Sequence, residues 1–198
     1  LAANMEPALN AVWDSGASAG DRIVVVGAGL VGLLIAALCA QMPGARVSVI
    51  DPEPARAPLL DAFGARWMPE AHGLDDGDVV FHTSASGEGL QAALGCCGPG
   101  ARLVEVSWYG DRPVSVKLGG AFHAPRIQIV SSQVGTFPPA RLPRWTHARR
   151  RAMALTLLKD DRLDALITEE VAFPDLPAAL PRLLAPGAPG IATVVRYD

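Results

Sequence analysis

The sequence is poor in charge and in aromatic side chains. Only 19% of its 198 residues are charged, 6% are aromatic, and the formal net charge is −3. A chain without a basic excess gives no electrostatic reason to expect a nucleic acid or an anionic membrane as its partner. Half of the residues are hydrophobic, which argues against disorder and provides enough apolar side chains for a sizeable core.

Cysteine is also scarce. The three cysteines are Cys39 and the adjacent pair Cys96 and Cys97, and no C-x-x-C spacing occurs. An odd number without paired spacing excludes a zinc knuckle and a secreted disulfide framework. A reducing cytoplasm is therefore the expected compartment.

The sequence lacks an uninterrupted hydrophobic run of membrane-spanning length. Residues 23–41 are mostly apolar, but three glycines interrupt them, whereas a membrane span needs about 20 consecutive apolar residues. No basic segment of the secretory type precedes them. Because the first residue is Leu rather than Met, we expect a fragment or a processed chain.

Short apolar runs alternate with helix-like segments through the first two thirds of the chain. Strands of this apolar kind, separated by helices, are typical of a parallel sheet that is covered on both faces. The sequence therefore predicts an α/β fold with a doubly wound parallel sheet. The expected strands are residues 23–26, 47–50, 79–82, 103–106 and 127–130, and the expected helices between them are 30–41, 54–63 and 90–97.

The segment "GAGLVG", residues 27–32, has the G-x-G-x-x-G spacing of a dinucleotide-binding turn, and it lies between the first expected strand and the first expected helix. Gly27 would permit the tight turn, and Gly29 would let the backbone approach a pyrophosphate. Gly32 would let the helix lie close to the strand. The start of the helix would then offer free N–H groups to the phosphates.

An acidic residue also stands where this fingerprint requires one. Asp51 closes the second expected strand, "VSVID". Its carboxylate would accept hydrogen bonds from the adenosine ribose and repel a 2′-phosphate, so NAD is favoured over NADP. Arg56 could instead stack on adenine or tolerate that phosphate. The cofactor contacts expected on this side are Gly27, Gly29, Leu30, Val31, Gly32, Asp51, Pro52 and Arg56.

Methyltransferases that use S-adenosylmethionine also combine a glycine-rich turn with an acid after the second strand. In those enzymes an acid usually ends the first strand, whereas here the apolar run 24–26 leads directly into Gly27. We therefore keep this class as a less favoured alternative.

The order of the segments resembles the medium-chain dehydrogenase/reductase family, in particular its zinc-type alcohol dehydrogenase group. "NMEPALNAVWDSGASAGDRIVVVGAGLVG" is similar to the family's helix, loop, first strand and glycine turn, and "DPEPARAPLLDAFGA" resembles the segment that follows the second strand. "GDVVFHTSASGEGLQAALGCCGPGARLVEV" is similar to a later strand that ends in small hydroxyl residues, its helix, and a glycine-rich turn into the next strand. The tail, from "ALTLLKDDRLDALITEE" to "IATVVRYD", resembles the closing segment, whose last strand returns to the catalytic domain.

This resemblance implies three parts: an opening helix and loop (1–20), a Rossmann dinucleotide-binding domain (21–140) and a C-terminal segment of helices and strands (141–198). In the C-terminal segment we expect helices over residues 146–159 and 175–184, and strands over 165–168 and 191–196. The amino-terminal catalytic domain, which in this family carries most zinc ligands and the proton relay, has no counterpart in the sequence.

Glu6 is the one metal-site residue that the resemblance places in this chain. In the polyol dehydrogenase branch a Glu-Pro pair on this helix contributes a carboxylate to zinc, and Glu6-Pro7 matches it. One carboxylate does not hold a metal. A glutamate followed by proline is also an ordinary way to begin a helix.

Three further strands end in residues that are mostly small or carry a hydroxyl group. The resemblance places the residues after two of these strands along the nicotinamide ribose and ring: Thr83, Ser84, Ala85, Ser107 and Trp108. It places Ser131, after the third strand, close to them. Trp108 and Tyr109 could form a wall of the substrate pocket or an aromatic pair that covers the surface. His82, His123 and His147 lack metal-binding spacing, so each is expected to be an ordinary strand-end or surface residue.

The resemblance implies the NAD-binding portion of a zinc-type alcohol dehydrogenase-like oxidoreductase, which moves a hydride between nicotinamide and a small alcohol or carbonyl substrate. We expect this chain alone to bind the cofactor without turnover. The alternative is a non-catalytic NAD-binding module that acts as a sensor or scaffold. We expect no nucleic-acid or membrane partner, and a homodimer formed through the edge strand near residues 125–132.

Overall fold

A six-stranded parallel sheet forms the centre of the structure, a computed structural model that describes residues 1–185 and 187–197. The strand order β3-β2-β1-β4-β5-β6 is that of a Rossmann domain. Pro186 and Asp198, which belong to the C-terminal segment expected over residues 141–198, lie outside the described residues. The strands are β1 (Arg22–Val26), β2 (Arg46–Ile50), β3 (Arg66–Met68), β4 (Gly77–His82), β5 (Cys97–Glu105) and β6 (Gln128–Ser131). The predicted doubly wound α/β fold is confirmed.

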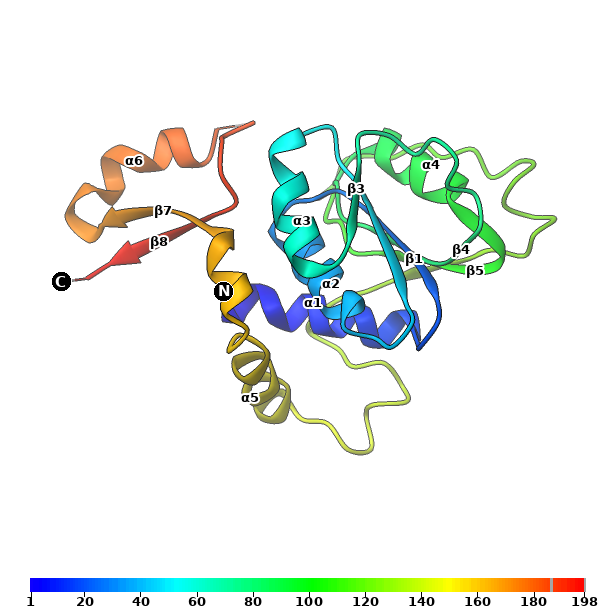
Figure 1. Cartoon of the computed structure of the whole chain (residues 1–198), viewed down its shortest axis with the longest axis horizontal. Coiled ribbons are helices and arrows are strands. Elements are labelled where there is room, and N and C mark those ends of the chain that lie inside the picture. Colours follow the sequence, from blue (N-terminus) through cyan, green and yellow to red (C-terminus); the bar gives the residue numbers. More distant parts are fainter. Residues whose placement is uncertain (186, 198) are drawn as a thin grey trace.

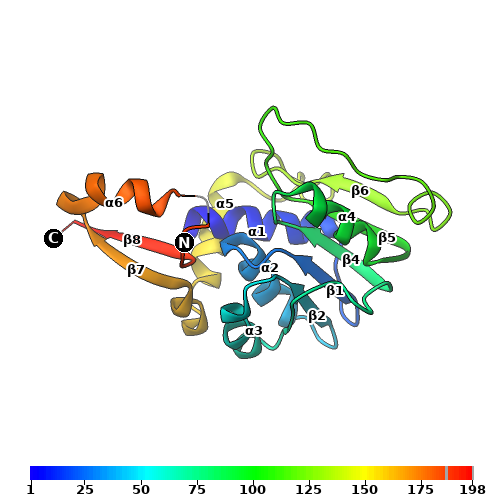
Figure 2. The ribbon, with the colours of Figure 1, turned by 90° about the horizontal axis from the view of Figure 1, so that it is seen from above.

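Helices cover both faces of this sheet (Figures 1 and 2). The α-helices are α1 (Ala2–Ser15), α2 (Leu30–Ala40), α3 (Ala57–Phe63), α4 (Gly87–Gly95), α5 (His147–Leu157) and α6 (Leu176–Leu183). On one face, α1, α2 and α3 pack on alternate strand residues such as Val25 and Phe81. On the other face, α4 packs on the intervening residues, such as Val24 and Val80. This alternation follows from the two-residue period of a strand.

The centre of the sheet forms where the sequence is most apolar. β1 reads Arg-Ile-Val-Val-Val, and its β-branched side chains favour an extended backbone. Ile23 and Val25 pair with Val47 and Val49 of β2 in parallel register. α2 is apolar on nearly its whole circumference and is largely buried, as expected for a helix between the sheet and α1. None of the helices in the described ranges is long and apolar enough to cross a membrane.

The C-terminal segment forms a smaller unit that extends to one side of the sheet (Figure 1). β7 (Ile167–Ala172) and β8 (Ala192–Arg196) form a separate two-stranded parallel sheet, with α6 beside it. Phe173, Leu184 and Tyr197 in this unit are exposed. The unit is joined to the main domain through the 3-10 helix Asp161–Leu166, in which Leu163 and Leu166 are buried in the main core.

Three strand expectations differ from the structure. β3 was not expected. β5 begins at Cys97, six residues before the expected start. The reason is that Gly77 of β4 pairs with Cys97, and the N–H of Gly77 donates a hydrogen bond to Cys96 O at 2.9 Å. Accordingly the preceding helix ends at Gly95 rather than at Cys97. The strand expected at residues 165–168 begins only at Ile167, because Asp160 caps the 3-10 helix before it.

Candidate functional site

The glycine turn lies between β1 and α2, at the carboxyl edge of the sheet. Gly27 has a φ of +107°, and a Cβ there would lie 2.8 Å from Ser84 N. A Cβ on Gly32 would collide with the carbonyl oxygen of Gly27. Around Gly29, by contrast, a Cβ would meet no heavy atom within 4 Å. Two of the three glycines are therefore required by packing, and the third leaves an open approach to the backbone.

Thr83 locks the turn from the neighbouring strand. It follows β4 directly, and its hydroxyl lies 2.7 Å from the carbonyl oxygen of Gly27 and 3.1 Å from that of Val26. The backbone N–H of Thr83 donates to the same Val26 carbonyl at 2.9 Å. These contacts join the ends of β1 and β4, so the residues after β4 lie beside the turn.

Asp51 lies on the other side of the turn, directly after β2. Its Oδ2 accepts a hydrogen bond from the N–H of Ala28 at 2.7 Å, and its Oδ1 accepts one from the N–H of Glu53 at 2.9 Å. The indole N–H of Trp67 donates to the Asp51 carbonyl at 2.9 Å. The carboxylate is half-buried, so it both holds the turn and remains within reach of a ligand.

The other residues predicted to contact the cofactor beside the glycine turn differ in exposure and in their contacts. Leu30 and Val31 form the first turn of α2 and are half-buried, while Pro52 is exposed. Gly29 caps α2 without a side-chain hydrogen bond, so the first N–H groups of this helix are available to an anion. The guanidinium of Arg56 donates to the carbonyl of Gly190 at 3.0 Å, which links it to the C-terminal unit.

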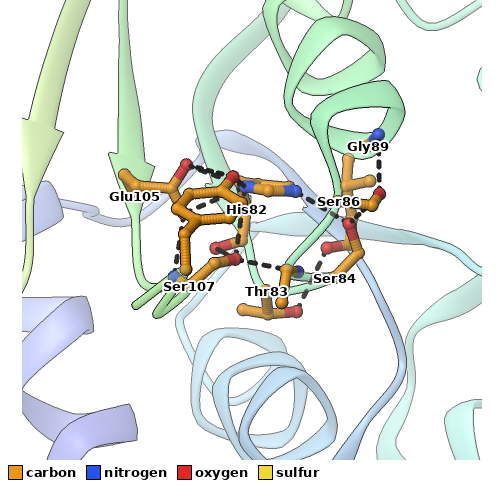
Figure 3. A network of polar contacts seen from close by, with 10 residues as sticks. His82, Thr83, Ser84, Ser86, Gly89, Glu105 and Ser107 are labelled. Atoms are coloured by element: carbon orange, nitrogen blue, oxygen red, sulfur yellow. Dashed lines mark hydrogen bonds and ion pairs between the residues drawn. The ribbon is translucent and has the colours of Figure 1, made fainter. Parts of the chain in front are cut away.

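A second polar cluster lies at the carboxyl ends of β4 and β5 (Figure 3). His82, which is fully buried, places its Nδ1 2.9 Å from both carboxylate oxygens of Glu105 and its Nε2 2.7 Å from the hydroxyl of Ser84. The N–H of Ser107 donates to Glu105 Oε1 at 2.8 Å, and the hydroxyl of Tyr109 donates to Oε2 at 3.1 Å. Every member therefore contacts another member through a polar atom.

The cluster shifts the acidity of two of its groups. Burial of Glu105 opposes its ionisation, but hydrogen bonds from His82 and Ser107 outweigh that effect and hold the carboxyl pKa below its usual range. Burial and the adjacent Glu105 carboxylate raise the pKa of the Tyr109 phenol to about 12. Glu105 therefore stays ionised and Tyr109 stays protonated at neutral pH.

The sequence interpretation missed this cluster. It treated His82 as an ordinary strand-end or surface residue, and it assigned no role to Glu105. His82 does end a strand, but its side chain is buried and paired. The two residues are direct neighbours in the register of β4 and β5. The available indication was that His82 ends one expected strand and Glu105 lies next to the end of another, and parallel strands end at the same edge of a sheet.

The remaining predicted nicotinamide-side residues divide into two groups. Ala85 has a φ of +52°, and its N–H donates to the Ser107 hydroxyl at 3.1 Å, so these two residues join the cluster of Thr83 and Ser84. The side chain of Trp108 is 84% exposed, and the ring of Tyr109 stacks on that of His82, with ring centroids 6.3 Å apart. Ser131 ends β6 and is exposed.

Glu6 pairs with two arginines. One carboxylate oxygen lies 3.1 Å from Arg150 Nε, and the other lies 3.7 Å from Arg151 Nε. Arg150 is buried and also bonds to Asn10 and to the carbonyl of Val134. Within residues 1–185 and 187–197, no three His, Cys, Asp or Glu side chains are grouped closely enough to hold a metal. The zinc-ligand role of Glu6 stays a prediction, and the described residues do not complete such a site.

Comparisons with known proteins find dehydrogenases that are similar to this chain in sequence or in fold. No protein-family model matches the chain. D-guloside 3-dehydrogenase of Escherichia coli is 29% identical over 185 residues, which are 86% of this chain and 53% of that enzyme. The chain thus spans about half the length of the curated relatives it matches.

Solved dehydrogenases share the fold over at least 94% of this chain. An Escherichia coli dehydrogenase of unknown specificity matches with a TM-score of 0.83 at 16% identity, over 100% of this chain and 57% of its own. Galactitol-1-phosphate dehydrogenase of Escherichia coli matches with a TM-score of 0.77 at 17% identity, over 94% of this chain and 57% of its own. An Escherichia coli alcohol dehydrogenase that was solved with NADH has a TM-score of 0.76 at 17% identity, over 98% of this chain and 57% of its own. In its motifs, its fold and its sequence, the chain is thus similar to the cofactor-binding half of zinc-type medium-chain dehydrogenases/reductases.

Proposed function

We propose that this chain is the NAD-binding portion of a dehydrogenase that transfers a hydride between nicotinamide and an alcohol or carbonyl substrate. The observation that carries the proposal is the open backbone at Gly29, flanked by the Asp51 carboxylate that holds Ala28 N–H at 2.7 Å. A cradle of this kind accommodates a pyrophosphate, and an acid at this position accepts hydrogen bonds from the adenosine ribose.

The residues of this chain would divide the cofactor between them. The first N–H groups of α2 would hold the pyrophosphate, and Asp51 would orient the adenosine ribose. Thr83 and Ser84 stand where a second ribose would lie along the sheet edge. When bound, the nicotinamide accepts or supplies the hydride. The described residues of this chain do not by themselves complete a zinc site. The three cysteines are free and buried, which suits a reducing compartment, and we propose the cytoplasm.

Calorimetric titration with NAD, NADP and S-adenosylmethionine tests this proposal. Asp51→Asn is the informative variant, because its side-chain oxygen can still accept from Ala28 N–H while the negative charge is removed. We expect the parent chain to bind NAD more tightly than NADP, and the variant to narrow that preference about tenfold, which corresponds to ~1.4 kcal/mol. Asp61→Asn, which removes an exposed charge on α3, is the matched control and should change neither affinity.

The titrations separate the alternatives. Binding of S-adenosylmethionine alone would assign the chain to the methyltransferases, and binding of none of the three would mean that the glycine segment is only a structural turn. We expect no NADH formation when alcohols are added to the NAD-bound chain. Such turnover would contradict the proposed dependence on a catalytic domain. If the chain binds NAD and the affinity for NAD does not fall when ethanol or a series of polyols is added, the result would fit a sensor or scaffold.

A further inference from the structure

Three residues of the polar cluster stand in the order carboxylate, imidazole, hydroxyl: Glu105, His82 and Ser84 (Figure 3). We propose that they form a second, nucleophilic site, in which Ser84 attacks the carbonyl carbon of a small carboxylic ester and His82 acts as general base. This activity is not a dehydrogenase step, and it belongs to the chain without bound cofactor, because a bound cofactor would lie over Ser84. The same order of groups activates serine on several unrelated folds.

The hydrogen bonds determine which nitrogen of His82 carries the proton. An ionised carboxylate only accepts hydrogen bonds, so Glu105 at 2.9 Å requires the proton on Nδ1. The lone pair of Nε2 then faces the Ser84 hydroxyl, 2.7 Å away. In this tautomer the imidazole can accept the proton of Ser84.

Glu105 is a positioning residue that is itself fixed on two sides. The N–H of Ser107 holds one oxygen at 2.8 Å, and the Tyr109 hydroxyl holds the other at 3.1 Å. Both groups donate to an ionised carboxylate, so they favour the charge that orients His82. The carboxylate also stabilises the imidazolium that forms when Ser84 gives up its proton.

Gly89 makes room for the contact between His82 and Ser84. A Cβ at this position of α4 would collide with Ser84 Oγ and would lie 2.9 Å from His82 Nε2. The N-terminal cap of α4 does not require His82 or Ser84, because Ser86 alone accepts a hydrogen bond from the N–H of Gly89, at 3.0 Å. A buried carboxylate–imidazole pair costs desolvation and is weak evidence of a stabilising role.

The nucleophile is accessible, and donors for a developing oxyanion lie nearby. Ser84 is exposed, although His82 beneath it is fully buried. A cavity of about 400 Å³ next to it is lined by Ala85, Ser86 and Tyr109, among others. The N–H groups of Gly87 and Glu88, the first two of α4, require no intrahelical partner, whereas that of Gly89 donates to Ser86. Backbone N–H groups of this kind stabilise the oxyanion of acyl transfer.

The reaction balances with water as the only co-reactant. The Ser84 oxygen bonds to the ester carbonyl carbon as its proton passes to His82 Nε2. The carbon–oxygen bond to the leaving alcohol then breaks, and that alcohol takes the proton from His82. Water attacks the acyl-serine, gives its proton to His82, and the carboxylic acid leaves as the proton returns to Ser84.

A fluorophosphonate probe tests the nucleophile directly, because the serine oxygen replaces fluoride on phosphorus. We expect peptide mass spectrometry to place the label on Ser84, and p-nitrophenyl acetate to be hydrolysed by the same site. Ser84→Ala should abolish both reactions. Ser18→Ala, which removes an exposed hydroxyl in the loop before β1, is the matched control and should change neither.

Further variants test the general base and its orientation. His82→Gln should lower the labelling rate at least about 100-fold, the lower end of what general-base catalysis contributes. Glu105→Gln should lower it more than about tenfold, and Glu105→Asp should recover part of that loss because it restores the carboxylate. Gly89→Ala keeps all three groups but displaces Ser84 from His82, so it should also slow labelling even if the His82 variant fails to fold.

The outcomes that overturn the proposal are equally specific. They are absence of label on the folded parent chain, a label on another residue, or a Ser84 labelling rate that Gly89→Ala and Glu105→Gln leave unchanged. Circular dichroism of each variant verifies the fold before the rates are compared.

Discussion

Gly29 and Gly32 lie three residues apart, yet a methyl group at each would have a different effect. Gly32→Ala places a Cβ against the backbone carbonyl of Gly27, and we expect it to lower the free energy of unfolding by about 1–3 kcal/mol. Gly29→Ala meets no neighbour and has an ordinary φ of −70°, so stability should stay equal or rise by up to about 1 kcal/mol. Urea unfolding measures both, and equal destabilisation would contradict the assigned packing role of Gly32.

Glu105 should make stability depend on pH in the acid range. Its pKa in the folded chain is held below the ordinary value of 4.5, so its ionised form stabilises the fold fully above that value. The contribution is lost as the pH falls through the lowered pKa. Glu105→Gln should therefore destabilise the chain by about 1–3 kcal/mol at neutral pH.

Unfolding at a series of pH values checks this expectation. The stability difference between the parent and Glu105→Gln should shrink as the pH falls from about 5 to about 3. Glu88→Gln, on the exposed start of α4, is a suitable control. A difference that stays constant down to about pH 3 would mean that the native contacts of Glu105 do not depend on its charge.

Among the larger elements, the β7–β8 unit should open most easily. It is a two-stranded sheet separate from the main sheet, and such pairs are marginally stable by themselves. One polar tie to the main domain is the bond from Arg56 to Gly190 O at 3.0 Å. We expect backbone amides of β7 and β8 to exchange with deuterium faster than those of β1 and β4.

Removal of the hydrogen bond between Arg56 and Gly190 should increase the difference in exchange rate between β8 and β1. Arg56→Ala should speed exchange in β8 while leaving β1 unchanged, and Arg66→Ala, an exposed arginine in β3, should have no such effect. Exchange in β8 as slow as in β1 would show that the unit is held by more than these contacts.

The agreement between the expected and the observed bounds of each helix or strand depends on how clear its local sequence pattern is. β1 and α2 were predicted to within a residue or two because a β-branched run, a glycine turn and an apolar helix follow one another there. β3 has only three residues and alternates little, so no periodicity identified it. In β5 the Gly-Pro-Gly sequence imitated a turn, whereas pairing with Gly77 draws the backbone into the sheet.

For the whole molecule, the exposed edge of β6 underlies the expected homodimer. β6 pairs with β5 on one side only among the described strands, and Ile129 in it is 40% exposed. Edge strands of this kind pair readily with a second chain. We expect light scattering at micromolar concentration to give twice the chain mass of 20.7 kDa.

Ile129→Lys provides the corresponding variant, because a charge on an edge strand disfavours pairing. The variant should be monomeric, while Leu142→Lys, at an exposed residue outside β6, should remain a dimer. A monomeric parent chain would refute the edge-strand homodimer.

The sequence by itself determined the fold class, the glycine turn and the position of Asp51. Each of these depends on local features: apolar periodicity, glycine spacing and an acid that directly follows a strand. Only the tertiary structure decided what the strand ends do together. Glu105 and His82 lie 23 residues apart in sequence, and they meet because β4 and β5 are neighbours in parallel register. Likewise, Arg150 reaches Glu6 across 144 residues, because chain folding brings α5 against α1.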